Sequence, residues 1–134
     1  MKSLFIALTL ISSFSFAQTT SVKMAPGHYT GADKDTGTVT ADVILNADHT
    51  LFMMLKTPDF ETPAPGCTGI YEEIGNDINS DVTCPMDFLP TAKVRLDITA
   101  VNPISVNSEA GADVPVYVDA LGTDPIIFVL KLVP

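Results

Sequence analysis

The chain has 134 residues, of which 46% are hydrophobic and 17% charged, and its formal net charge at pH 7 is −9. This combination of many apolar and few charged residues excludes an intrinsically disordered chain. The acidic balance, without any cluster of lysine and arginine, argues against nucleic acid and anionic lipid as partners.

Residues 1–17 have the pattern of a secretory signal peptide. Lys2 precedes an apolar run over residues 4–11 that is too short to span a bilayer. Small residues ending at Ala17 form an A-x-A-like cleavage site. We therefore expect a secreted or periplasmic protein whose mature chain, residues 18–134, forms one domain. It has no second long apolar segment, so we expect it not to span a membrane.

The first part of the mature chain predicts three strands. A short strand covers residues 24–31, and residues 38–45 alternate apolar and polar side chains with a period of two. A turn over residues 46–49 leads into a third strand over residues 50–57. His49 occupies a position where such turns require a left-handed backbone, which histidine tolerates better than most residues do.

A disulfide-linked hairpin is predicted next. Cys67 and Cys84 are the only cysteines, and in an exported protein they predict one structural disulfide. Gly75-Asn76 is a favourable two-residue turn of type II′ for a hairpin over residues 67–84. With this turn Cys67 lies opposite Cys84 in a non-hydrogen-bonded pair, where the Cα atoms are about 4.5 Å apart and a disulfide fits.

The remaining segments predict loops and strands on either side of this hairpin. Residues 57–66 contain three prolines and form a stiff loop, and residues 85–90 form a second loop. Further strands are expected over residues 93–101, 114–120 and 126–133. A short strand over residues 104–106 is an additional alternative.

These elements predict an all-β fold with one disulfide. No segment shows a sustained helical period with caps. Seven or eight short strands indicate an antiparallel up-and-down barrel, with a β-sandwich as the alternative. Residues 51–55 and 126–130 are apolar on both strand faces, so a loop, a second sheet or another copy of the chain must cover the outer face. A homodimer is one such arrangement.

The stretch from Gly27 to Leu51 resembles small bacterial lipocalin-like (calycin-type) envelope barrels. Those proteins run G-x-Y-x-G into a strand that ends L-x-x-D-G-T. Here the matching segments are GHYTG, residues 27–31, and VILNADHTL, residues 43–51, with His49 in place of the usual glycine. The lipocalin G-x-W signature, the C-terminal helix and the CxxC of copper-response lipoprotein barrels are absent. The resemblance implies a fold, and it carries over no ligand or functional residue.

Catalytic motifs are sparse. The disulfide leaves no free cysteine, no Gly-x-Ser-x-Gly elbow occurs, and adjacent glutamates at 72 and 73 point to opposite faces of a strand. We predict no catalytic residue and favour a non-enzymatic protein. A hydrolase or isomerase would require His28, Asp42, Asp97 and Tyr117 to share one cavity.

Metal ligands are equally sparse. A soft copper site would need His28 and His49 together with the methionines at 24, 53, 54 and 86, but the spacing suits core methionines and surface histidines better. Residues 33–37 are similar to the start of a calcium loop, yet Ile44 stands where an EF-hand needs glutamate, so a polar turn is preferred. The sequence therefore predicts no metal and no cofactor.

The sequence as a whole predicts an exported barrel that binds a small apolar ligand or a protein partner of the cell envelope. Five aromatic or apolar residues are the candidate ligand-binding residues: Tyr29, Tyr71, Tyr117, Phe52 and Met54. The alternative is a secreted inhibitor or interaction protein that presents the proline-rich loop 57–66, because a stiff loop loses little entropy on binding.

Overall fold

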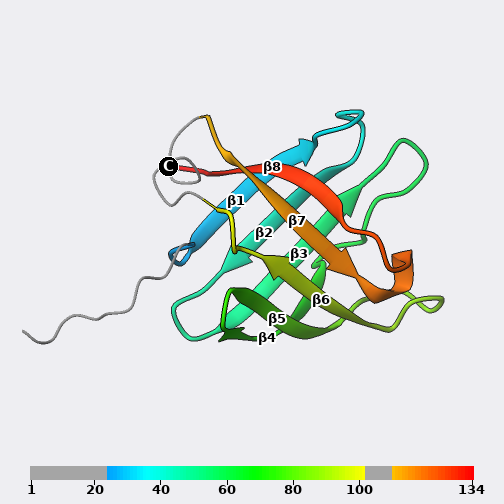
Figure 1. Ribbon diagram of the computed structural model, residues 1–134. Coiled ribbons are helices and arrows are strands. Elements are labelled where there is room, and N and C mark those ends of the chain that lie inside the picture. The colour runs from blue at the N-terminus through cyan, green and yellow to red at the C-terminus, as the bar shows by residue number, and fades with distance from the viewer. Residues whose placement is uncertain (1–23, 102–109) are drawn as a thin grey trace, which may run out of the picture.

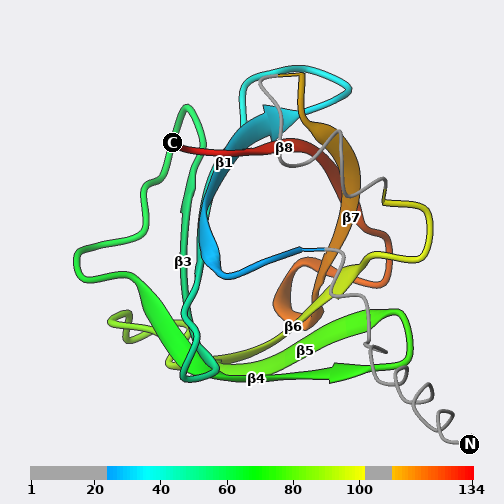
Figure 2. The ribbon, with the colours of Figure 1, turned by 90° about the vertical axis from the view of Figure 1, so that its left-hand side faces the viewer.

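The computed structural model describes residues 24–101 and 110–134, and its strands form one closed antiparallel barrel (Figures 1 and 2). Each strand pairs with the next along the chain, and the last pairs with the first. In chain order the strands are β1 (Gly27–Asp33), β2 (Thr40–Leu45), β3 (Thr50–Lys56), β4 (Cys67–Ile74), β5 (Asp77–Thr83), β6 (Thr91–Asp97), β7 (Ala112–Val118) and β8 (Ile126–Leu132). The predicted up-and-down barrel is confirmed, with eight strands.

In the described residues the one helical segment is the 3-10 turn Asp119–Leu121 between β7 and β8. No helix long and apolar enough to cross a membrane occurs in this part of the chain.

The strand boundaries differ from the predicted ones mainly at β1 and β6. β1 begins at Gly27 because Pro26, just before it, has no N–H to offer to a ladder. β6 ends at Asp97, where Val101 N–H bonds to the Ile98 carbonyl oxygen in a turn. Ala100, which lies near the end of the predicted strand over residues 93–101, is therefore exposed and outside β6. The alternative strand over 104–106 lies outside the described residues.

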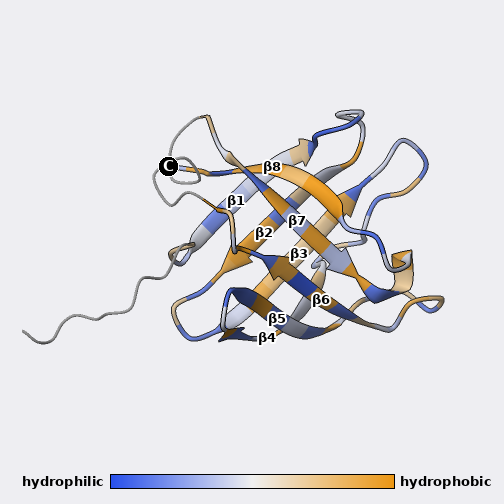
Figure 3. Cartoon of the chain, viewed as in Figure 1, coloured by the Kyte–Doolittle hydropathy of each residue, from blue (hydrophilic) through white to orange (hydrophobic). Residues whose placement is uncertain are grey.

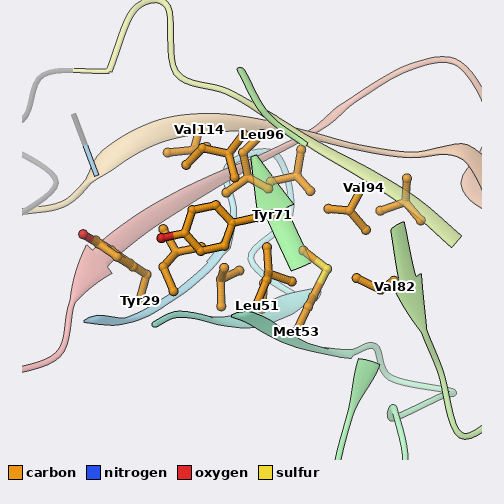
Figure 4. Close-up of a cluster of buried hydrophobic side chains, with 14 of the residues drawn as sticks. Tyr29, Leu51, Met53, Tyr71, Val82, Val94, Leu96 and Val114 are labelled. Atoms are coloured by element: carbon orange, nitrogen blue, oxygen red, sulfur yellow. The ribbon is translucent and has the colours of Figure 1, made fainter. Parts of the chain in front are cut away.

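The alternation of side chains fills the barrel as predicted. Along β2 the side chains of Ala41, Val43 and Leu45 are buried, and Val94 and Leu96 of β6 face them from across the interior. Bands of hydrophobic and hydrophilic residues accordingly alternate along the strands (Figure 3). In close-up, inward side chains from several strands meet in one cluster (Figure 4).

The disulfide hairpin is confirmed. Ile74 pairs with Asp77 across the turn, and Gly75 has a φ of 62°. Cys67 and Cys84 are disulfide-bonded with their Cα atoms 4.1 Å apart, close to the predicted separation. His49 has a φ of 70°, so the predicted left-handed turn residue is confirmed as well.

The outer apolar face of β3 is covered by the chain itself. Thr62 in the loop 57–66 donates its N–H to the Leu55 carbonyl oxygen at 2.9 Å. A Cβ atom at Gly66 would lie 2.7 Å from Cγ of Met54, so the end of this loop packs directly on the outward Met54 side chain. The sequence predicted that a loop, a second sheet or another copy of the chain covers this face, and on β3 it is a loop. On β8, Ile127 keeps 37% of its side chain exposed.

One end of the barrel is closed by large side chains. The β2–β3, β4–β5 and β6–β7 connections lie at this end, because the strands alternate in direction. Tyr29 is fully buried there and donates its hydroxyl to the Ala25 carbonyl oxygen at 2.5 Å, while the Tyr71 hydroxyl donates to Asn46 at 3.2 Å. Met24 is buried in the same cluster.

Closure of the ring depends on a glycine in β1. Gly31 pairs with Leu130 of β8, and a Cβ atom at position 31 would overlap the carbonyl oxygen of Val129. Relieving this overlap would require the backbone of β8 to move, which costs more free energy than moving a side chain.

We expect Gly31→Ala to lower the free energy of unfolding by about 1–3 kcal/mol, measured by urea denaturation. Ala32→Ser, one residue further and on the outer face, is the matched control and should cost under about 0.5 kcal/mol; equal losses would refute this role for Gly31.

Candidate functional site

An apolar cavity of about 360 Å³ lies at the end of the barrel opposite the closed one. The β1–β2, β3–β4, β5–β6 and β7–β8 connections meet at this end, and each of the four contributes residues to the cavity lining. The inner part of its wall consists of side chains from the barrel, among them Met53, Val82, Ala92, Val94 and Val118.

Loop residues form the outer part of the wall. Phe60 comes from the proline-rich loop 57–66, Phe88 from the loop between β5 and β6, and Leu121 from the 3-10 turn. Their side chains are 37%, 76% and 54% exposed, respectively. Phe60 and Phe88 meet edge to face with ring centroids 5.9 Å apart. Three exposed apolar side chains on different connections therefore border the mouth of the cavity.

The few polar groups in the wall are already hydrogen-bonded. Thr62 donates its hydroxyl to the Leu55 carbonyl oxygen at 3.1 Å and accepts the Leu55 N–H at 3.0 Å. The Thr57 hydroxyl donates to the Phe60 carbonyl oxygen at 3.4 Å and accepts the Asp59 N–H at 3.2 Å. Among the described residues, these are the two hydroxyl-bearing members of the lining, and no charged residue belongs to it. The wall therefore favours hydrocarbon over groups that need hydrogen bonds.

The disulfide joins the bases of the two loops that carry the phenylalanines. Cys67 follows the loop 57–66 and Cys84 precedes the other loop, and both cysteines line the cavity. The second loop is closed by a hydrogen bond from Cys84 N–H to the Pro90 carbonyl oxygen at 2.8 Å. The covalent link thus fixes the position of one loop base relative to the other.

Asp33 organises the turn between β1 and β2, which contributes Val39 to the cavity wall. The residue is 8% exposed, and its carboxylate accepts the N–H groups of Val39 at 2.9 Å and Thr36 at 2.7 Å. These donors stabilise the charged form and lower the pKa of Asp33 to about 2. Residues 33–37, which are similar to the start of a calcium loop, thus form a polar turn in which nearby backbone N–H groups bond to the Asp33 carboxylate.

The structure brings together only two of the five predicted ligand-binding residues. Tyr29 and Tyr71 lie in the core at the closed end (Figure 4). Burial, with a smaller contribution from Tyr71, raises the pKa of Tyr29 to about 12. Phe52 and Met54 alternate with the buried residues of β3 and point outward. Tyr117 also faces outward, with the Arg95 guanidinium 3.8 Å from its ring centre. None of the five lines the cavity.

The residues proposed for an enzymatic alternative are spread over the barrel wall. Nε2 of His28 lies 2.8 Å from the Asp42 carboxylate across β1 and β2, on the outer face. Asp97 and Tyr117 belong to β6 and β7.

The candidate residues for a copper site also lie in different parts of the barrel. His49 stacks on Tyr71 at 5.1 Å in the β2–β3 turn, whereas Met53 and Met86 line the cavity. Over residues 24–101 and 110–134, no group of three or more histidine, cysteine or acidic residues is placed to hold a metal ion.

Phe60, Phe88 and Leu121, which border the cavity mouth, are not among the ligand-binding residues predicted from the sequence. A usable signal was present. Each loop flanking the cysteine pair carries one phenylalanine among prolines and acidic residues, and a predicted disulfide brings the bases of those loops together.

Comparison of the chain with family models, curated proteins and solved structures finds no match.

Removal of the Asp33 charge should destabilise the protein near neutral pH. The pKa of this carboxyl is lowered in the folded state, so its contribution is complete above about pH 4 and is lost as the pH falls towards 2. We expect Asp33→Asn to lower the urea midpoint at pH 7, and the difference from wild type to shrink in acid. Asp35→Asn, an exposed neighbour in the same turn, is the control; a difference for Asp33→Asn that does not depend on pH would contradict this account.

Proposed function

We propose that this protein is exported and binds a small apolar ligand in the cavity without catalysing a reaction on it. The observation that carries the proposal is the wall itself, which is apolar and whose two hydroxyl groups are already hydrogen-bonded. The cavity volume of about 360 Å³ falls within the range of about 300–1,000 Å³ that is typical of small-molecule sites.

The chemistry of the wall supports binding rather than catalysis. A catalytic site needs groups that transfer protons, attack, or stabilise charge at a reacting atom. In this wall the two cysteine sulfurs are bonded to each other, and the hydroxyls of Thr57 and Thr62 already have partners.

Export is part of the proposal and rests on the sequence of residues 1–17 together with the disulfide, which persists in oxidising compartments.

Filling the cavity tests the proposal. Ala92 is buried in the wall, so Ala92→Val, Ala92→Leu and Ala92→Phe remove progressively more of the space. We expect the affinity for the neutral apolar probe N-phenyl-1-naphthylamine, measured by its fluorescence, to fall along this series, by about tenfold or more for phenylalanine, which corresponds to about 1.4 kcal/mol.

Ala47→Phe is the matched control, because Ala47 is exposed in the β2–β3 turn at the other end of the barrel. Circular dichroism and a thermal melt establish that each variant is folded. Undiminished probe binding by folded Ala92→Leu and Ala92→Phe, or no binding by wild type, would refute ligand binding in the cavity.

A second candidate function is recognition of a protein partner by the loop 57–66. Its support is the exposed pair of Phe60 and Phe88, whose rings contact each other on loops joined at their bases by the disulfide. Exposed aromatic residues on rigid supports are frequent anchors of interfaces.

Native mass spectrometry of protein isolated from its own source separates the two candidates. Ligand binding predicts a small added mass, whereas recognition predicts a second protein at fixed stoichiometry that Phe88→Ala removes. Ile74→Ala, an exposed apolar residue at the opposite end, should retain such a partner. A partner that survives Phe88→Ala but not Ile74→Ala would exclude the contacting pair of Phe60 and Phe88 as the binding surface.

A further inference from the structure

The charges around the cavity mouth indicate which class of apolar ligand enters it. Asp59 and Glu61 flank Phe60 in sequence, and Asp87 lies between Met86 and Phe88. All three acidic residues are exposed. Every lining residue of these two loops therefore lies within two sequence positions of an exposed carboxylate.

No ion pair joins these carboxylates to a cation in the described part of the chain, although Lys56 and Glu61 are partners in an isolated β-bridge. The ion pairs there involve four other carboxylates, those of Asp42, Asp77, Asp81 and Asp113. Lys56, at the end of β3, is the one exposed cation adjacent in sequence to a lining residue of the two loops. The rim contributed by these loops therefore carries more negative than positive charge.

The wall and the rim impose different requirements on one ligand. The interior accepts a hydrocarbon part and offers it no hydrogen-bonding group, as shown above for Thr57 and Thr62. Any polar part must then remain at the mouth, beside the carboxylates. There a positive head group is attracted and a negative one is repelled, with an energy that salt weakens.

Building on the proposed function, we infer that the ligand is an amphiphile that enters tail first and carries a cationic head group. An uncharged head group of the same chain length should bind less tightly, and a carboxylate least tightly. Fatty acids are therefore the disfavoured members of this ligand class.

Three ligands with one decyl tail provide the test: decyltrimethylammonium, decanol and decanoate, each below its micelle concentration. Their affinities are measured by displacement of N-phenyl-1-naphthylamine from the full protein at pH 7. We expect the ammonium ligand to bind about tenfold more tightly than the carboxylate at low ionic strength. At about 0.5 M salt, where screening lengths are a few ångströms, this ratio should fall towards one.

The double variant Asp59→Asn/Asp87→Asn should reduce the ratio by about threefold at low salt without changing the affinity for decanol. Glu72→Gln/Glu73→Gln removes two exposed charges from the hairpin at the closed end and should leave the ratio unchanged. Equal reductions in both double variants would assign the effect to net charge and overturn the role of the rim.

The outcomes also distinguish a failure of this inference from a failure of the proposed function. Decanoate binding as tightly as decyltrimethylammonium, with decanol bound, would overturn the inference and leave ligand binding intact. Failure of all three ligands and of the probe to bind would refute the proposed function, and the inference with it.

Discussion

The pairing of β1 with β8 is the constraint on which the rest of the structure depends. Five residue pairs join these strands and turn a linear meander into a ring. Without that ladder β1 and β8 would be free edges, which are prone to pair with other chains. The close approach of Gly31 to the Val129 backbone occurs within this ladder. Closure also gives the molecule an inside, and therefore a place for both a core and a cavity.

Because consecutive strands of the closed barrel run in opposite directions, successive connections lie at opposite ends, and the two ends differ. At one end, Tyr29 of β1, Tyr71 of β4 and Met24 from the segment before β1 are buried together and close the core. At the other, the two loops next to the disulfide place Phe60 and Phe88 around an opening. The disulfide therefore constrains the loops at the open end. Rigid loop bases lower the entropy lost when a ligand or partner binds.

The sequence predicted the barrel well because local rules set most of its elements. A period of two fixed the inward faces of β2 and β6, and turn chemistry fixed His49 and Gly75. The binding site was less accessible to such reasoning. Phe52, Met54 and Tyr117 were predicted to bind the ligand, but they alternate with the buried residues of their strands and point outward from the barrel. Which face of a strand points inward depends on the register of the closed ring. The mouth residues Phe60 and Phe88 lie on loops 28 positions apart along the chain, and only the disulfide and tertiary packing bring them into contact.

The size of the side chains bears on the cavity at the open end. Its inner wall includes the small residues Ala92, Val82, Val94 and Val118 beside the larger Met53, Leu55 and Ile126, whereas tyrosine, leucine and methionine contribute to the closed end. Larger residues at the wall positions would bury more apolar area and stabilise the fold, since unfilled apolar space costs free energy. An open apolar space walled by small side chains therefore lowers stability, and a bound hydrocarbon restores the missing contacts by shifting the equilibrium towards the folded state. The same side chains that leave the core incomplete are those that define what the cavity accepts.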